Sequence, residues 1–211
     1  MMSFRSLKLG TVFLAIVLAS IGLLTDRGRG IERVLASDIT VGQAALTDDP
    51  VKARAAFNDA VKVFFSARCA NCHPAGDTPT QGDKMTPHTM GVIRGTDGKG
   101  APEQRCSTCH QEMNLEGEGL PPGAPNWHMP PADHKMPFQG VSAAELCRNL
   151  KDPKTNGGGK TLKEAVHHVE TDPLVMWAWS PGEGRTLPPL SHADFVAKLN
   201  EWINNGGACP E

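Results

Sequence analysis

Two short cysteine–histidine motifs are the part of this chain best suited to chemistry. One runs from residue 69 to 73 (CANCH) and the other from residue 106 to 110 (CSTCH). Each is a CxxCH pattern, in which two thiols three positions apart are followed at once by a histidine, as in covalent haem attachment. The thiols can form thioethers with one haem, and the histidine can ligate its iron. The sequence therefore predicts two covalently bound haem c groups, with anchors Cys69, Cys72, Cys106 and Cys109 and proximal ligands His73 and His110.

Two other chemistries use paired cysteines. Four cysteines can hold a structural zinc ion, and a single CxxC can act as a thioredoxin-like redox pair. The two pairs here are farther apart than in the usual zinc ribbon, and a histidine follows both of them. These features favour haem over zinc or a dithiol.

The ligand on the far side of each iron decides what a haem protein does. Two strong axial ligands suit electron transfer, whereas an open position can bind a small molecule. Proline-stiffened loops carry His88 and His128, and the latter has Trp127 beside it to cover a ring face. We expect His88 and His128 to be the distal ligands. The reserve candidates are Met136, just before an expected helix, and His168 within one, and the histidines expected to be solvent-exposed are His134, His167 and His192.

The two remaining cysteines, Cys147 and Cys209, have two interpretations. In an oxidising compartment a leftover pair most simply forms a disulfide. The alternative is that one of the two thiolates ligates an iron.

Four amphipathic segments are expected to position these residues. A helix beginning at Asp49-Pro50 should run into the first motif, and another should extend from Ser191 to Gly206-Gly207. Apolar residues recur in both at i, i+4, i+7 and i+8, so the two helices can pack together. Shorter helices should begin at Ser142 and Thr161 and end before Pro153 and Pro173.

The remaining chain is rich in glycine and proline and shows no strand pattern. Loops are expected over 74–105, 111–141 and 173–190, and loops of this length are unusual in a compact domain unless they wrap something. Aromatic residues make up only 5% of the chain, so side chains alone give a thin core. We therefore expect a mainly α fold, with cytochrome c-like helices and long loops wrapped around two haems.

The N-terminal residues have a different character. Arg5 and Lys8 precede an apolar run from Leu9 to Leu24, which is typical of an export signal. Residues 1–36 are expected to be either a cleaved signal peptide or a membrane anchor, followed by a dihaem domain over 37–211. Both alternatives predict a periplasmic protein, soluble or anchored to the inner membrane.

The charge balance bears on partners. The 211 residues include 21 Lys and Arg against 23 Asp and Glu, which argues against a nucleic-acid-binding protein. Residues 37–211 hold 16 basic and 21 acidic residues, so we expect a redox partner with a basic docking face.

Together with the two motifs, four further segments of the chain resemble a known family. They are Pro87-His88, RGTDGKG at 94–100, DPLVMWAW at 172–179 and GACP at 207–210. Over about residues 68–211 the chain resembles small bacterial dihaem c-type cytochromes labelled as isoquinoline 1-oxidoreductase subunits. The resemblance implies an electron acceptor for a molybdenum hydroxylase, and packed terminal helices as in c-type cytochromes. Because the chain has no recognisable molybdopterin or iron–sulfur motif, the catalysis would belong to the partner.

The resulting hypothesis is an electron-carrier subunit rather than an enzyme. It would pass electrons from a periplasmic dehydrogenase or molybdenum hydroxylase to the respiratory chain. The competing hypothesis is a dihaem oxidoreductase of the peroxidase or thiosulfate type, with one open or thiolate-ligated haem.

Overall fold

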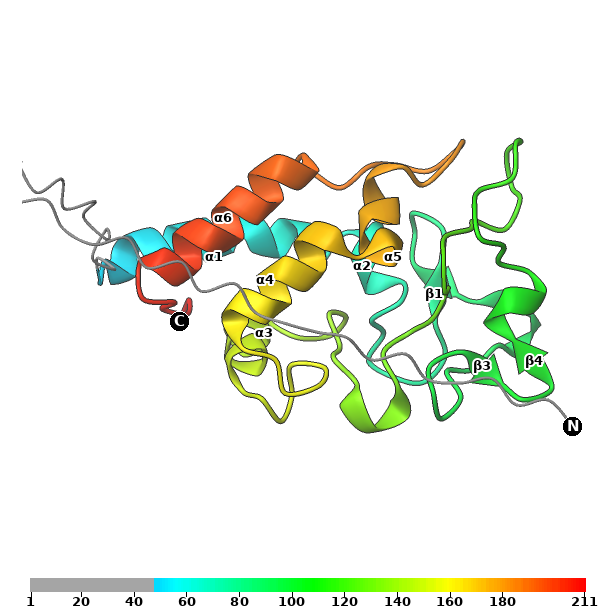
Figure 1. Cartoon of the computed structure of the whole chain (residues 1–211), viewed down its shortest axis with the longest axis horizontal. Helices are drawn as coiled ribbons and strands as arrows, with labels where there is room; N and C mark the ends of the chain where they lie inside the picture. Colours follow the sequence, from blue (N-terminus) through cyan, green and yellow to red (C-terminus); the bar gives the residue numbers. More distant parts are fainter. Residues whose placement is uncertain (1–47) are drawn as a thin grey trace, which may run out of the picture. The chain divides into compact units, whose positions relative to one another are not determined.

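Helices and long connecting loops dominate residues 48–211, which are the residues that this computed structural model describes (Figure 1). The described residues are thus rich in helix and poor in sheet, whereas the segment expected as a signal or anchor lies outside them. Within them, no helix is both long and apolar enough to cross a membrane. The α-helices are α1 (Pro50–Phe64), α2 (Ala67–Ala70), α3 (Ala143–Lys151), α4 (Leu162–Thr171), α5 (Pro173–Met176) and α6 (His192–Asn204).

The first and last helices lie side by side, as the matching apolar stripes predicted (Figure 1). The carboxylate of Asp49 caps α1 by accepting a hydrogen bond from the Lys52 amide at 3.0 Å, and Ser191 caps α6 in the same way. Between the helices, the rings of Phe57 and Trp202 have centroids 4.8 Å apart. This pair is buried and forms part of the main hydrophobic core.

The two middle helices also begin where the sequence predicted. Ser142 caps α3, and Thr161 forms a reciprocal capping box with Glu164 at the start of α4. The prediction of a loop over 173–190 is partly wrong, because α5 and a short 3-10 turn occupy the first residues of this range. The cause is Asp172, which ends α4 and whose carboxylate accepts from the Leu174 amide at 2.8 Å to begin α5.

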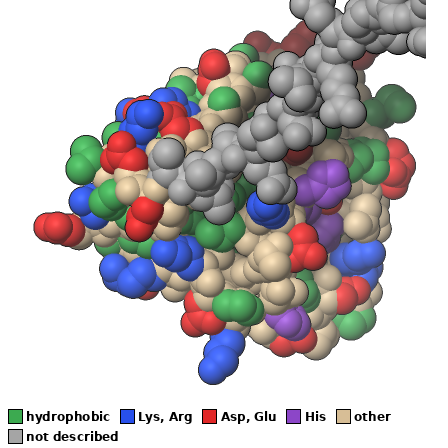
Figure 2. All heavy atoms as spheres, turned by 60° about the vertical axis from the view of Figure 1, so that its left-hand side comes forward, with side chains coloured by type: hydrophobic (Ala, Val, Ile, Leu, Met, Phe, Trp, Pro, Cys, Tyr) green, Lys and Arg blue, Asp and Glu red, His purple; other side chains and the backbone are tan. Residues whose placement is uncertain are grey.

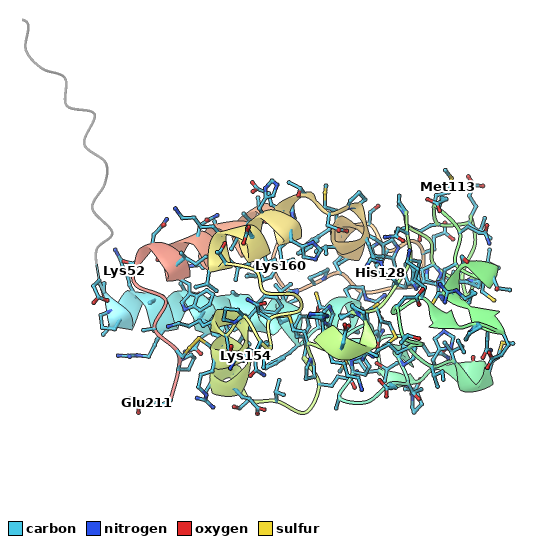
Figure 3. All side chains as sticks on the ribbon, turned by 60° about the horizontal axis from the view of Figure 1, so that its bottom comes forward. Lys52, Met113, His128, Lys154, Lys160 and Glu211 are labelled. Carbon is cyan, nitrogen blue, oxygen red and sulfur yellow. A yellow bond between two sulfur atoms is a disulfide. The ribbon has the colours of Figure 1, made fainter. Side chains whose placement is uncertain are left out.

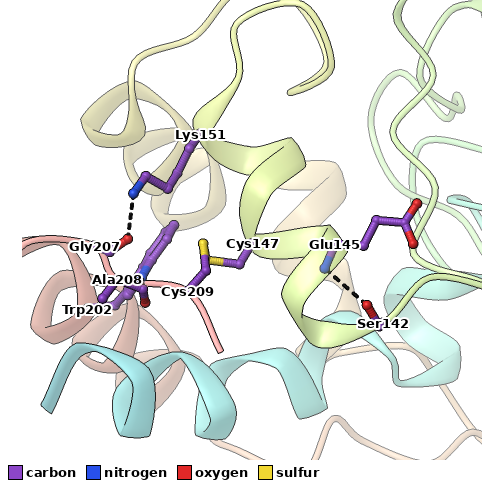
Figure 4. The surroundings of a disulfide bond; sticks show 8 residues. All are labelled: Ser142, Glu145, Cys147, Lys151, Trp202, Gly207, Ala208 and Cys209. Atoms are coloured by element: carbon purple, nitrogen blue, oxygen red, sulfur yellow. Dashed lines mark hydrogen bonds between the residues drawn. A yellow bond between two sulfur atoms is a disulfide. The ribbon is translucent and has the colours of Figure 1, made fainter. Parts of the chain in front are cut away.

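A disulfide joins α3 to the segment after α6 (Figure 4). Cys147 is bonded to Cys209, and their Cα atoms are 5.6 Å apart. Beside the bond, the Lys151 ammonium donates to the Gly207 carbonyl at 2.8 Å. The predicted disulfide is therefore present, and it leaves neither of these sulfurs as a thiolate for iron.

The loops after the first motif contain two small hairpins that the sequence pattern did not reveal. β1 (Thr80–Gln81) pairs with β2 (Thr86–Pro87), and β3 (Gly100–Ala101) pairs with β4 (Gln104–Arg105). Strands of two residues are too short to show an alternating pattern.

One buried arginine holds several of these loops together. The guanidinium of Arg94, 1% exposed, donates to the Asp77 carboxylate at 3.1 Å and to the carbonyls of Gly76 at 2.9 Å and Pro130 at 2.5 Å. The turn at 76–77 and the distant segment at 130 thus meet at a single side chain.

Candidate functional site

Both CxxCH motifs fold as a tight helical turn. In the first, which continues from α2, the amide of Cys72 donates to the Cys69 carbonyl at 3.2 Å. In the second, the amide of Cys109 donates to the Cys106 carbonyl at 3.2 Å. Residues three positions apart in such a turn lie on the same side of it. Each pair of thiols is therefore presented in one direction, and none of the four cysteines is in a disulfide.

The imidazole of His73 is fixed by two contacts. Its Nδ1–H donates to the Met136 carbonyl at 2.7 Å, and its ring stacks on Phe138 with centroids 3.9 Å apart and planes 8° apart. Since Nδ1 carries the proton, Nε2 keeps its lone pair for a metal. A metal-ligating histidine is usually oriented by a hydrogen bond of this kind, made by the ring nitrogen that does not bind the metal.

The imidazole of His110 is held in the same way by different residues. Its Nδ1–H donates to the Pro122 carbonyl at 2.7 Å, and its ring stacks on Trp127 with centroids 4.4 Å apart and planes 3° apart. Burial lowers the pKa of His110 and lowers that of His73 to about 4. Both imidazoles are therefore neutral near pH 7, which is the form that binds metal.

The first motif opens into a cavity of about 320 Å³, here called the central cavity. Its walls are mostly apolar and come from α1, α3, α4, α5, α6 and the 128–138 loop. An apolar hollow lined by the thiols and imidazole of a CxxCH motif has the donor set that a covalent haem requires. Besides Cys69, Cys72 and His73, the cavity is lined by Phe64, Leu150, Val166, Trp177, Phe195 and Leu199.

Three of the four predicted distal ligands also line the central cavity. His128, which Figure 3 labels where the helices meet the loop-rich part, turns its Nδ1 to the Asn126 carbonyl at 2.5 Å. His168 on α4 turns its Nδ1 toward the Asp172 carboxylate at 3.4 Å. Met136 lines the cavity too, but its carbonyl is the group that orients His73. The backbone of Met136 thus lies behind the proximal imidazole.

The fourth predicted ligand, His88, lies instead at the second motif. Its ring centroid is 6.2 Å from that of His110. The structure thus gathers His128, His168 and Met136 at the first motif and places His88 at the second.

The three histidines that were expected to be solvent-exposed differ in their burial. His134 and His167 are exposed, as predicted. His192 is half-buried, because its ring packs on Trp179 and its Nε2 is 3.0 Å from the Val169 carbonyl. The sequence expectation for His192 was therefore wrong, and this histidine helps to join α6 to α4.

Arg68, directly before the first motif, is a residue of the central cavity that the sequence analysis missed. Its guanidinium pairs with Asp83 at 2.5 Å and lies 5.9 Å from the Trp177 ring centroid. The side chain is buried, yet its Nε–H has no hydrogen-bond partner. A buried unpaired donor needs an acceptor, and the carboxylates of a haem are acceptors of that kind. The only feature of the sequence that could have indicated this position for Arg68 is that it directly precedes Cys69.

Within residues 48–211, no three His, Cys, Asp or Glu side chains come together as a metal-binding group. A reactive dithiol needs a lowered thiol pKa. Burial instead raises the pKa of Cys69 to about 12 and that of Cys72 to about 11.

A chain of aromatic rings connects the two motifs. Trp127, which stacks on His110, also meets Trp177 edge-to-face with centroids 4.9 Å apart. Trp177 in turn lines the central cavity of the first motif, and its indole N–H donates to Asn114 at 2.9 Å. The sequence predicted that Trp127 covers a haem face beside His128, and the structure shows its ring stacked on the imidazole of His110.

Known proteins offer no further guide to this site, since no family model, curated protein or solved structure matches the chain.

Proposed function

We propose that this chain is an exported dihaem c-type electron carrier that passes electrons from a dehydrogenase or molybdenum hydroxylase partner to the respiratory chain. One observation carries the proposal. Each CxxCH turn presents two unbonded thiols in one direction and is followed by an imidazole whose Nδ1–H is bound to a carbonyl and whose ring is stacked. The same arrangement occurs twice, with different supporting residues.

The chain's own residues have defined roles in this proposal. Bound haem would supply reversible one-electron chemistry at iron. Cys69 and Cys72 hold one group and Cys106 and Cys109 the other. The carbonyls of Met136 and Pro122 keep the proximal imidazoles in the ligating tautomer. The mostly apolar walls of the central cavity would limit the access of water to a bound haem, which favours outer-sphere electron transfer.

The aromatic contacts between the motifs support a role in transfer from one site to the other. Trp127 and Trp177 fill the space between His110 and the central cavity with packed rings. This packing of rings favours electron transfer between two redox centres.

The charges of the side chains indicate what kind of surface a docking partner would have. On the face drawn in Figure 2, acidic and basic side chains are interspersed, and histidine side chains reach the surface. Residues 37–211 carry an excess of acidic side chains, which favours a partner with a basic docking face. The family resemblance makes a molybdenum hydroxylase the partner to test.

Haem stoichiometry tests the proposal directly. The full chain is expressed with its N-terminal segment in a bacterium that attaches haem c, and the intact mass of the exported protein is measured. We expect two haems in the wild type and one in each of the double variants Cys69→Ala/Cys72→Ala and Cys106→Ala/Cys109→Ala.

The chain provides a matched control for these variants. Cys147→Ala/Cys209→Ala removes the same number of sulfurs from the disulfide and should keep both haems. A colourless wild-type protein, or equal haem loss in all three double variants, would contradict the proposal.

A further inference from the structure

We infer that His88 is the second axial ligand opposite His110, so that the haem of the second motif is held between two imidazoles. This inference rests on the proposed function and goes beyond it, because it assigns a ligand and closes that iron on both sides. It is carried by the relation of His88 to His110 and by the contacts that hold His88 in place.

The spacing of the two rings fits a shared metal. A metal–imidazole bond of about 2.0 Å puts the ring centroid roughly 3.1 Å from the metal, so two opposed imidazoles have centroids about 6.2 Å apart. The centroids of His88 and His110 are 6.2 Å apart, and their planes are inclined by 63°. Two imidazoles in direct contact would lie closer together.

Both rings are also held in the tautomer that ligates through Nε2. The Nδ1–H of His88 donates to the Thr89 carbonyl at 2.8 Å, and that of His110 donates to the Pro122 carbonyl at 2.7 Å. Within residues 48–211, neither Nε2 has a hydrogen bond to the protein. Each ring thus keeps one unused lone pair.

The backbone explains how His88 reaches a motif that begins 18 residues later in the chain. His88 directly follows β2, and its amide donates to the Pro79 carbonyl at 2.9 Å. The β1–β2 hairpin is anchored on the first motif, where the Thr80 amide donates to the Asn71 carbonyl at 3.0 Å. Beyond His88, the Met90 carbonyl accepts from the Gln104 amide group at 3.0 Å, just before the second motif. The segment that bears His88 is therefore fixed at both ends.

The other candidates do not compete for this position. His128 and His168 line the central cavity of the first motif. Met90 lies on the same segment as His88 but is 77% exposed. Met90 is therefore the residue whose variant best controls for disturbance of the segment.

The test compares His88→Ala, His88→Met and the control Met90→Leu in the exported, haem-loaded chain. Intact mass first establishes that each variant keeps two haems. In the reduced state, His88→Ala should bind one more carbon monoxide per chain than the wild type. In the oxidised state, it should gain a high-spin component that added imidazole removes.

His88→Met gives an independent result, because a thioether ligand raises the reduction potential relative to imidazole. One of the two potentials should rise and the other should stay unchanged, whereas Met90→Leu should match the wild type. If His88→Ala keeps two haems with unchanged spectrum and carbon monoxide stoichiometry, the ligand assignment is overturned while the proposed function stands. If the wild type carries no covalent haem, the mass shows it and both fall together.

Discussion

The indole of Trp127 lies parallel to the imidazole of His110, with ring centroids 4.4 Å apart. Stacked pairs contribute about 1 kcal/mol beyond the area that they bury. Trp127→Leu should lower the free energy of unfolding by roughly 1–3 kcal/mol, measured by chemical denaturation. Trp127→Phe keeps an aromatic ring on the imidazole, so its free energy of unfolding should fall by less than that of Trp127→Leu. Equal losses in the two variants would show that the stacking contributes nothing specific.

The disulfide should make a large contribution to stability. Cys147 and Cys209 are separated by 62 residues, and a loop of this size is worth about 4 kcal/mol in the chain-entropy model. Cys147→Ala/Cys209→Ala should therefore unfold at a clearly lower denaturant concentration under oxidising conditions. With a reducing agent present, the wild type and the variant should unfold at the same denaturant concentration. An unchanged difference between their midpoints would show that packing, rather than the disulfide, causes it.

The buried cation Arg68 should tune the first redox centre. Positive charge in the central cavity favours the reduced state of a bound haem, so Arg68→Met should lower one reduction potential by on the order of tens of mV. Lys84→Met removes a charge from an exposed position and serves as the control. Potentiometric titration of both proteins checks this, and equal shifts would mean that the burial of Arg68 is irrelevant.

Acid should weaken the hairpin that leads into the second motif. Hydrogen bonds from Arg105 lower the pKa of Asp97 to about 2, below its value of about 3.9 in an unfolded chain. This ion pair therefore stabilises the fold above about pH 4, and its contribution is lost as the pH falls toward 2. Asp97→Asn should be less stable than the wild type at pH 6 but not at pH 2. Denaturation curves at both pH values check this, with Glu103→Gln, in the turn between β3 and β4, as control.

The sequence predicted the helices well because their information is local. The cap at Asp49 and the stripe that includes Phe57 lie within one helix, and the same holds for the helix that begins at Ser191. The start of α5 was missed because Asp172 serves two helices at once. Its double role becomes visible only when both hydrogen-bonding partners are known.

The sequence shows the two motifs of the candidate site but not how the structure arranges the residues around them. Spacing alone identified the CxxCH residues, because the chemistry lies within five consecutive positions. Which distal candidate faces which motif depends on contacts between distant loops, such as that of His88 with His110. Met136 illustrates the limit, since its thioether suggested a ligand while its backbone carbonyl orients His73.

The clamp formed by Arg94 has a consequence for the motions of the loops that it joins. Because a single side chain holds the turn at 76–77 and the segment at 130, neither can open far without breaking the same hydrogen bonds. Amide hydrogen exchange in these two segments should therefore proceed as one cooperative unit, with a common opening free energy.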